Sequence, residues 1–104
     1  MLKIYGSEMC PDCRECKRNF DLYKIDYQFI DINETLGNLK VFLDMRDHEP
    51  VFDRLKAIGD IGLPAIVKED GEVFTDWETY LRQMGHEPVY EEISQSCSID
   101  RKGC

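Results

Sequence analysis

Apolar positions in the first third of the chain predict a strand, a helix and a second strand. Residues Leu2 to Tyr5 predict the first strand, which ends at a turn at Gly6-Ser7. Pro11 suits the first position of a helix, because its missing N–H would have no partner there. The apolar residues that follow recur at helical spacing: Cys13, Cys16, Phe20 and Tyr23. Residues Tyr27 to Ile32 predict the second strand.

The middle of the chain predicts two helical segments. The first must end or bend before Pro50, because the residue before a proline disfavours helical backbone angles. Its apolar residues are Leu39, Phe42, Leu43 and Met45. The second segment covers Val51 to Ile58, and one of its faces carries Phe52, Leu55 and Ile58.

A β-hairpin and a closing helix follow. The hairpin strands are predicted at Ala65–Lys68 and Glu72–Phe74, on either side of the two-residue turn signal Asp70-Gly71. Thr75 and Glu78 have the spacing of a capping box, which predicts a helix start at Thr75. The helix then carries Trp77, Tyr80, Leu81 and Met84 at helical spacing. We expect Tyr5, Trp77 and Tyr80 to belong to the core.

This order of elements predicts an α/β protein. A strand–helix–strand unit, a further helix, an antiparallel pair and a last helix (βαβ-α-ββα) form the thioredoxin-like fold, a mixed four-stranded sheet flanked by helices. The predicted domain covers residues 1–85, with Gly85 as a left-handed helix stop. Residues 86–104 are expected to form a polar tail that carries Cys97 and Cys104.

Charge and composition narrow the choice of partners. The chain has 104 residues and a formal net charge of −8, whereas nucleic acids and anionic membranes require a basic surface. The N-terminus lacks a signal-peptide pattern, and no stretch approaches the about 20 apolar residues of a membrane span, so we expect a cytoplasmic protein. Thiols stay reduced there, so the five cysteines are interpreted as redox-active, metal-binding or buried.

The segment Cys10-Pro11-Asp12-Cys13 lies where the first predicted strand passes into the first predicted helix. Unpaired N–H groups at a helix N-terminus favour the thiolate of Cys10, and Cys13 lies one turn further on, within disulfide reach. This pattern predicts that Cys10 attacks a disulfide and that Cys13 resolves the intermediate. Zinc sites share the spacing but need further ligands, and neither His48 nor His86 lies in a ligand pattern.

The chain resembles a glutaredoxin over about residues 1–85. The matching segments are Lys3-Ile4-Tyr5, Cys10-Pro11-Asp12-Cys13, Lys17 and Gly62-Leu63-Pro64. The resemblance implies that Pro64 is cis and lies beside the cysteines, and that the Leu63 backbone pairs with a substrate peptide or glutathione. Thr75 and Asp76 are the positions that could hold a γ-glutamyl carboxylate, and Pro11 is also expected to contact substrate.

Two acidic residues depart from the glutaredoxin pattern near the nucleophile. Glu8 stands where a lysine is usual, and Asp12 where an aromatic residue is usual. Both carboxylates are expected to raise the pKa of Cys10, while the helix N-terminus and the motif lower it. We expect the lowering to prevail.

The leading hypothesis is a thiol–disulfide oxidoreductase without a bound cofactor, for which glutathione is a candidate co-substrate. Its partners would be disulfide-containing proteins or low-molecular-weight thiols, and the source of electrons is open. The alternative is a metal- or iron–sulfur-binding protein that uses Cys10, Cys13 and Cys16. Cys16 is otherwise expected to be a buried thiol, and Cys97 and Cys104 to be redox-active or incidental. A third hypothesis is a binding module without turnover.

Overall fold

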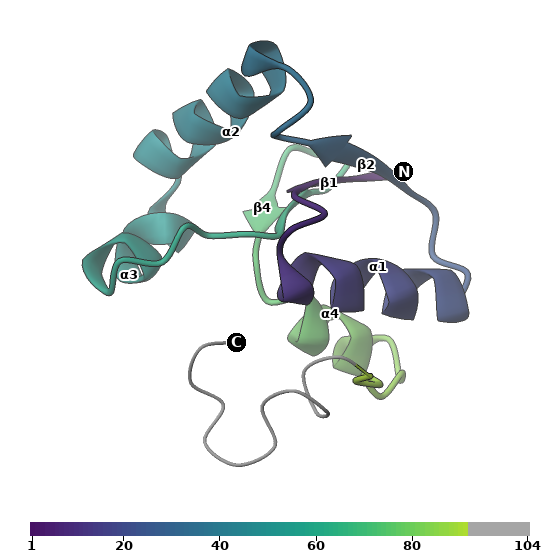
Figure 1. Ribbon diagram of the computed structural model, residues 1–104. Coiled ribbons are helices and arrows are strands. Elements are labelled where there is room, and N and C mark those ends of the chain that lie inside the picture. Colours follow the sequence, from purple (N-terminus) through teal and green to yellow (C-terminus); the bar gives the residue numbers. More distant parts are fainter. Residues whose placement is uncertain (92–104) are drawn as a thin grey trace.

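The computed structural model describes residues 1–91 (Figure 1). Cys97 and Cys104, with the roles expected for them, lie outside the described residues. The elements are β1 (Leu2–Gly6), α1 (Pro11–Leu22), β2 (Tyr27–Asp31), α2 (Leu36–His48), the 3₁₀ helix η1 (Pro50–Phe52), α3 (Asp53–Ala57), β3 (Ala65–Val67), β4 (Val73–Phe74) and α4 (Trp77–Gln83). None of the helices in this part of the chain is both long and apolar enough to cross a membrane.

The four strands form one mixed sheet in the order β2-β1-β3-β4. β1 is parallel to β2, with Ile4 opposite Phe29, and antiparallel to β3, with Tyr5 opposite Ala65. The parallel pair needs a crossover connection, which α1 supplies, whereas β3 and β4 join through a hairpin. This topology is the thioredoxin-like fold, so the predicted α/β class and mixed four-stranded sheet are confirmed.

Helices cover both faces of the sheet. In Figure 1, α1 and α4 lie on one side of it, and α2 and α3 lie on the other. The core between the sheet, α1 and α4 contains Leu2, Ile4, Cys16, Phe20, Ile66, Trp77 and Leu81. A second cluster, on the α2 and α3 side, contains Ile32, Phe42, Phe52, Leu55 and Ala65. Neighbouring strand residues such as Ala65 and Ile66 point to opposite faces, so each cluster takes alternate positions of one strand.

The predicted hairpin is present, but its turn differs from the expected one. Val67 pairs with Val73, and the N–H of Lys68 donates to the carbonyl of Glu72 at 2.8 Å, which leaves a three-residue loop, residues 69–71. Gly71 has a φ of +94°, the left-handed position that closes such a loop. The two-residue turn predicted at Asp70-Gly71 is therefore wrong by one residue.

Two predicted helix boundaries also shift. The helical segment expected over 51–58 is η1 followed by α3, which ends before Ile58 and leaves that side chain 67% exposed. The N-cap of α4 is Asp76, whose carboxylate accepts the N–H of Thr79 at 3.0 Å. Thr75 is therefore not the cap. The helix starts one residue later than the capping-box spacing predicted, so the Asp76 side chain faces the free N–H groups.

Residues 86–91 pack against α1. The Asn19 side chain accepts the N–H of Val89 at 2.7 Å and donates to its carbonyl at 2.8 Å. The buried carboxylate of Glu15 accepts the N–H of Glu91 at 2.7 Å. Residues 86–91, the first part of the expected tail, thus form hydrogen bonds with α1.

Candidate active site

Cys10 is the N-cap residue of α1, at the end of the loop that leaves β1. Its backbone is extended (φ −93°, ψ 115°), and its Sγ accepts the N–H of Cys13 at 3.3 Å. The loop closes on itself, because the N–H of Cys10 donates to the carbonyl of Ser7 at 3.1 Å. Cys10 is half-buried, whereas Cys13 is fully buried, and both thiols are free. One accessible sulfur therefore lies next to one enclosed sulfur.

The two thiols differ in acidity. A hydrogen bond from the Cys13 thiol, together with the backbone N–H groups of Cys13 and Asp12, lowers the pKa of Cys10 from 9.0 to about 7, although burial and the charge of Asp12 oppose this. The same hydrogen bond, and then burial, raise the pKa of Cys13 well above its usual range. Cys10 is thus the more acidic of the two thiols, and its pKa lies below 9.0, in the predicted direction.

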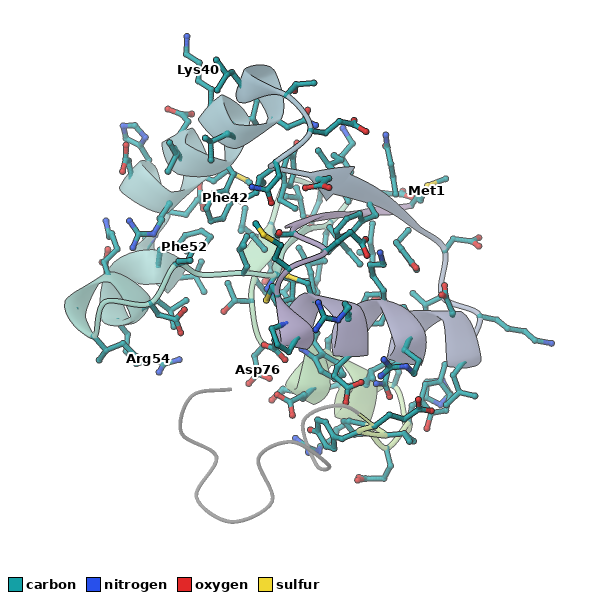
Figure 2. All side chains as sticks on the ribbon, in the orientation of Figure 1. Met1, Lys40, Phe42, Phe52, Arg54 and Asp76 are labelled. Atoms are coloured by element: carbon teal, nitrogen blue, oxygen red, sulfur yellow. The ribbon has the colours of Figure 1, made fainter. Side chains whose placement is uncertain are left out.

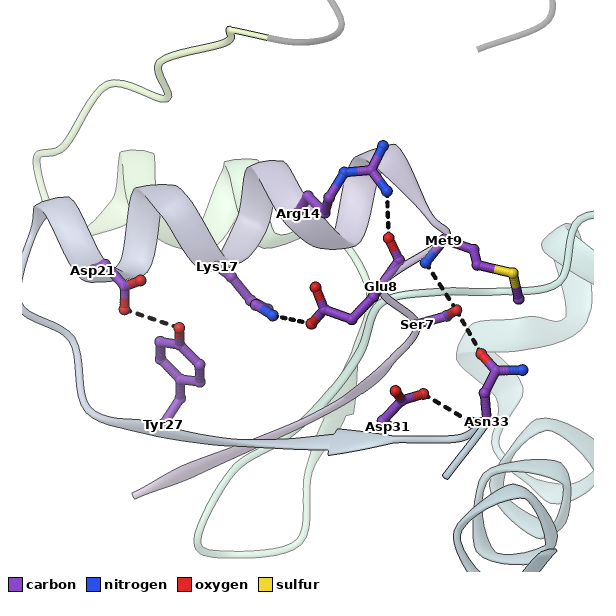
Figure 3. A network of polar contacts seen from close by, with 9 residues as sticks. All are labelled: Ser7, Glu8, Met9, Arg14, Lys17, Asp21, Tyr27, Asp31 and Asn33. Carbon is purple, nitrogen blue, oxygen red and sulfur yellow. Dashed lines mark hydrogen bonds and ion pairs between the residues drawn. The ribbon is translucent and has the colours of Figure 1, made fainter. Parts of the chain in front are cut away.

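The loop before Cys10 is held by polar contacts with Asn33, just after β2, and with α1 (Figure 3). The Ser7 hydroxyl donates to Oδ1 of Asn33 at 2.6 Å and accepts the N–H of Met9 at 3.1 Å. Glu8 is exposed and forms an ion pair with Lys17, whose Nζ lies 4.0 Å from the centre of the Phe29 ring. The carboxylate of Glu8 therefore has a cationic partner on α1.

Asp12 occupies a different environment. It is half-buried, and its Oδ1 accepts the indole N–H of Trp77 at 3.1 Å. Burial, and then the carboxylates of Asp60 and Asp76, raise the pKa of Asp12. Sequence analysis placed Trp77 in the core, where it is 1% exposed, but missed this hydrogen bond. The sequence contains no local pattern that predicts a contact between residues 65 positions apart.

The peptide bond between Leu63 and Pro64 is cis, as the resemblance implied. Pro64 is fully buried and Leu63 is half-buried, immediately before β3. Tyr5 of β1 pairs with Ala65 of the antiparallel strand β3. Gly6, which follows Tyr5, and Pro64, which precedes Ala65, therefore lie at the same end of the sheet. This is also the end from which the loop to Cys10 departs.

A surface cavity of about 270 Å³ lies beside the motif. Its lining residues are Asp12, Arg54, Leu55, Asp60, Gly62, Leu63, Thr75, Asp76 and Glu78. The fold thus brings together Leu63, Thr75 and Asp76, three of the five residues expected to bind substrate. The other two are Pro11, half-buried at the first position of α1, and the buried Pro64.

The cavity is predominantly acidic. Four of its lining residues are carboxylates and one is a cation, Arg54. Figure 2 labels Arg54, on α3, and Asp76, which precedes α4, so the cavity is bounded by elements far apart in the sequence. Nothing local in the sequence connects Arg54, on α3, to the cysteine motif.

Cys16 belongs to the hydrophobic core between the sheet, α1 and α4. It is fully buried in the cluster that contains Phe20, and this burial raises its pKa well above that of a free thiol. Among residues 1–91, no group of three or more His, Cys, Asp or Glu side chains could hold a metal ion. The metal-binding alternative therefore finds no support in the part of the chain that is described.

Comparisons with known proteins place the chain in a family. No family model matches it. A protein of Haemophilus influenzae, described as uncharacterized, is 36% identical over 73 residues, which span 70% of this chain and 85% of that protein. The chain belongs to the family of this protein. Its backbone also resembles two solved structures, a glutathione S-transferase from Xanthobacter autotrophicus (19% identity, TM-score 0.49) and a possible glutathione S-transferase from Rhodopseudomonas palustris (13%, 0.48). This chain spans only 37% and 38% of their lengths.

Proposed function

We propose that the protein is a thiol–disulfide oxidoreductase that acts in the manner of a dithiol glutaredoxin. The observation that carries the proposal is the pair formed by a half-buried Cys10 of lowered pKa and a buried Cys13 hydrogen-bonded to it. At neutral pH, Cys10 is substantially a thiolate, the reactive form in disulfide exchange. Such a dithiol works where thiols are kept reduced, which fits the cytoplasm.

The reaction proceeds in two exchanges. The Cys10 thiolate attacks one sulfur of a substrate disulfide, forms a mixed disulfide and releases the first product thiolate. Cys13 then attacks the Cys10 sulfur, the second product leaves as a thiolate and accepts the proton that Cys13 loses, and a Cys10–Cys13 disulfide forms. One substrate disulfide is reduced to two thiols while two cysteines are oxidised to one disulfide. A thiol or dithiol reductant would restore the starting state.

The cavity beside the motif is the proposed place for the substrate group next to the reacting sulfur. Leu63 would offer its backbone, and Thr75 and Asp76, just before α4, also line the cavity. The carboxylates of the cavity repel an anionic group, whereas Arg54 attracts one. Glutathione, which carries two carboxylates, is therefore a weaker candidate co-substrate than a neutral or cationic thiol.

Single-cysteine variants test the proposal. We expect Cys10→Ser to abolish disulfide reduction, because among the thiols of residues 1–91 only that of Cys10 combines partial exposure with a lowered pKa. Cys13→Ser should still attack and should accumulate the mixed disulfide, detected by intact-protein mass spectrometry. Cys16→Ala, at a buried thiol away from the exchange, serves as the matched control and should keep turnover. Dithiol turnover by Cys10→Ser at the wild-type rate would contradict the proposal.

A further inference from the structure

Gly6, the last residue of β1, lies directly against the resolving thiol. A Cβ atom at this position would lie 2.9 Å from Sγ and 3.4 Å from Cβ of Cys13, and 3.1 Å from Cε1 of Phe29. A glycine in a strand often marks a close approach by another group. Here the group that approaches the strand is the sulfur of Cys13.

Strand pairing holds the backbone of Gly6 in place. Gly6 is buried, pairs with Asp31 of β2, and its carbonyl accepts the N–H of Ile32 at 2.9 Å. The Cys13 side chain, in contrast, turns about a single bond between Cα and Cβ, so its sulfur can move without disturbing the backbone. A methyl group at position 6 would therefore be accommodated mainly by rotation of the Cys13 thiol, with a smaller adjustment of Phe29.

We propose that Gly6 is a positioning residue for the resolving step: its missing side chain leaves the space in which the Cys13 sulfur must lie to attack Cys10. This inference rests on the proposed function and assigns Gly6 a role in its second exchange. The attack forms the Cys10–Cys13 bond, breaks the bond between Cys10 and the substrate, and transfers the Cys13 proton to the departing thiolate. Its rate depends on alignment of the reacting sulfurs, and a displacement of about 1 Å can cost about 100-fold.

The first exchange depends on Gly6 in a different way. The N–H of Cys13 that holds the Cys10 sulfur belongs to the backbone and stays in place when the side chain turns. The hydrogen bond from the Cys13 thiol is lost, however, and it is the largest of the effects that lower the pKa of Cys10. Gly6→Ala should therefore raise the pKa of Cys10 and slow attack at neutral pH, but not at a pH well above this pKa.

A single-turnover experiment on the full chain separates the two steps. Gly6→Ala and the control Gly37→Ala are reduced and mixed with a small aromatic disulfide above the pKa of Cys10, and the mixed disulfide is followed by acid quench and mass spectrometry. The control Cβ meets only Oγ1 of Thr35 at 3.7 Å. We expect Gly6→Ala to form the mixed disulfide at a rate within about twofold of wild type but to resolve it about tenfold or more slowly. Gly37→Ala should match wild type in both steps.

Two further measurements distinguish the inference from the function on which it rests. The thiolate ultraviolet absorbance, titrated against pH, should show a higher Cys10 pKa in Gly6→Ala. The equilibrium between the Cys10–Cys13 disulfide and dithiothreitol should shift towards the open dithiol, and neither measurement requires substrate turnover. If the wild type forms no mixed disulfide, the proposed function fails, and these two readouts still decide the role of Gly6.

Resolution by Gly6→Ala at the wild-type rate would overturn the inference, as would equal slowing of both exchanges above the Cys10 pKa. If Gly6→Ala does not fold, Gly6→Ala combined with Phe29→Leu relieves the contact with the ring and retains the contact with the Cys13 sulfur. The same slow resolution and raised Cys10 pKa are expected for this variant, and their absence would equally refute the proposal.

Discussion

At the scale of single residues, the acidity of Cys10 depends on which neighbours are shielded from water. Asp12 is half-buried, adjacent along the helix, and raises the pKa of Cys10, whereas Glu8 is exposed and paired with Lys17. The charge of an exposed group is weakened by solvent. Glu8 and Asp12, which the sequence pattern treats alike, should therefore differ in their effect on the pKa of Cys10.

We expect Asp12→Asn to lower the pKa of Cys10 by less than about one pH unit, since one charge near the surface contributes about 0.2–1 kcal/mol. The asparagine oxygen can still accept the indole N–H of Trp77, so the packing is retained. Glu8→Gln is the control and should cause a smaller change. Alkylation rates measured as a function of pH would show this, and a larger shift in Glu8→Gln would contradict it.

The sign of the resulting pH dependence follows from linkage. The pKa of Cys10 is lowered on folding, from 9.0 to about 7, so the reduced protein gains stability as the pH rises above about 7, and loses that contribution as the pH falls through this value. Asp12→Asn should move the same transition to lower pH.

At the scale of elements, the start of α4 determines where the fourth helix meets the cavity. Asp76 caps the helix through the N–H of Thr79, and this hydrogen bond is the largest of the effects that lower the pKa of Asp76. The neighbouring Thr75 instead accepts the N–H of Trp77 through its backbone carbonyl at 3.0 Å. Replacing the Thr75 side chain leaves this backbone carbonyl in place and therefore does not remove the N-cap of α4.

We expect Asp76→Ala to reduce the free energy of unfolding by about 1 kcal/mol, the usual effect of losing an N-cap side chain. Thr75→Ala should have less effect, because the Thr75 side chain is not the cap. Urea unfolding of both variants at neutral pH provides the comparison. A greater loss for Thr75→Ala would support the capping box predicted from the sequence and contradict the observed cap.

At the scale of the whole molecule, we expect charge to select among the proposed disulfide substrates. The chain has a net charge of −8, and the cavity beside the cysteines has four carboxylates and one guanidinium. An acidic surface raises the local concentration of cationic partners and lowers that of anionic ones, and salt weakens both effects. The protein should therefore discriminate between disulfides by charge before any specific contact forms.

We expect a small disulfide with two amino groups to be reduced faster than oxidised glutathione. Asp60→Asn with Asp76→Asn should diminish the difference by a few-fold, at about 0.2–1 kcal/mol per charge, while asparagine preserves the cap of α4. Asp44→Asn, on α2 outside the cavity, is the control. Rates measured at low and high salt would decide this, and a preference unchanged in the double variant would refute a role for these carboxylates.

Most of the backbone, and the place of the cysteine motif in it, could be predicted from the sequence alone. The strand and helix order, the position of Cys10 at a helix start and the hairpin at Gly71 all follow from local preferences, because proline, glycine and apolar spacing act on a few consecutive residues. The start of α4 lies one residue after the predicted one, with Asp76 rather than Thr75 as the N-cap. Both side chains are able to cap a helix, and the local spacing of residues does not choose between them.

The surroundings of the two sulfurs, in contrast, follow from how the elements pack together. Trp77 reaches Asp12 from α4, Arg54 joins the cavity from α3, and Gly6 meets Cys13 because β1 packs against α1. These contacts arise when separate helices and strands bury their apolar faces together, which brings distant residues within a few ångströms without a local pattern. The cysteine motif at a helix start could thus be predicted from the sequence, whereas the acidity of Cys10, the cavity beside it and the space around the Cys13 sulfur depend on how the elements pack.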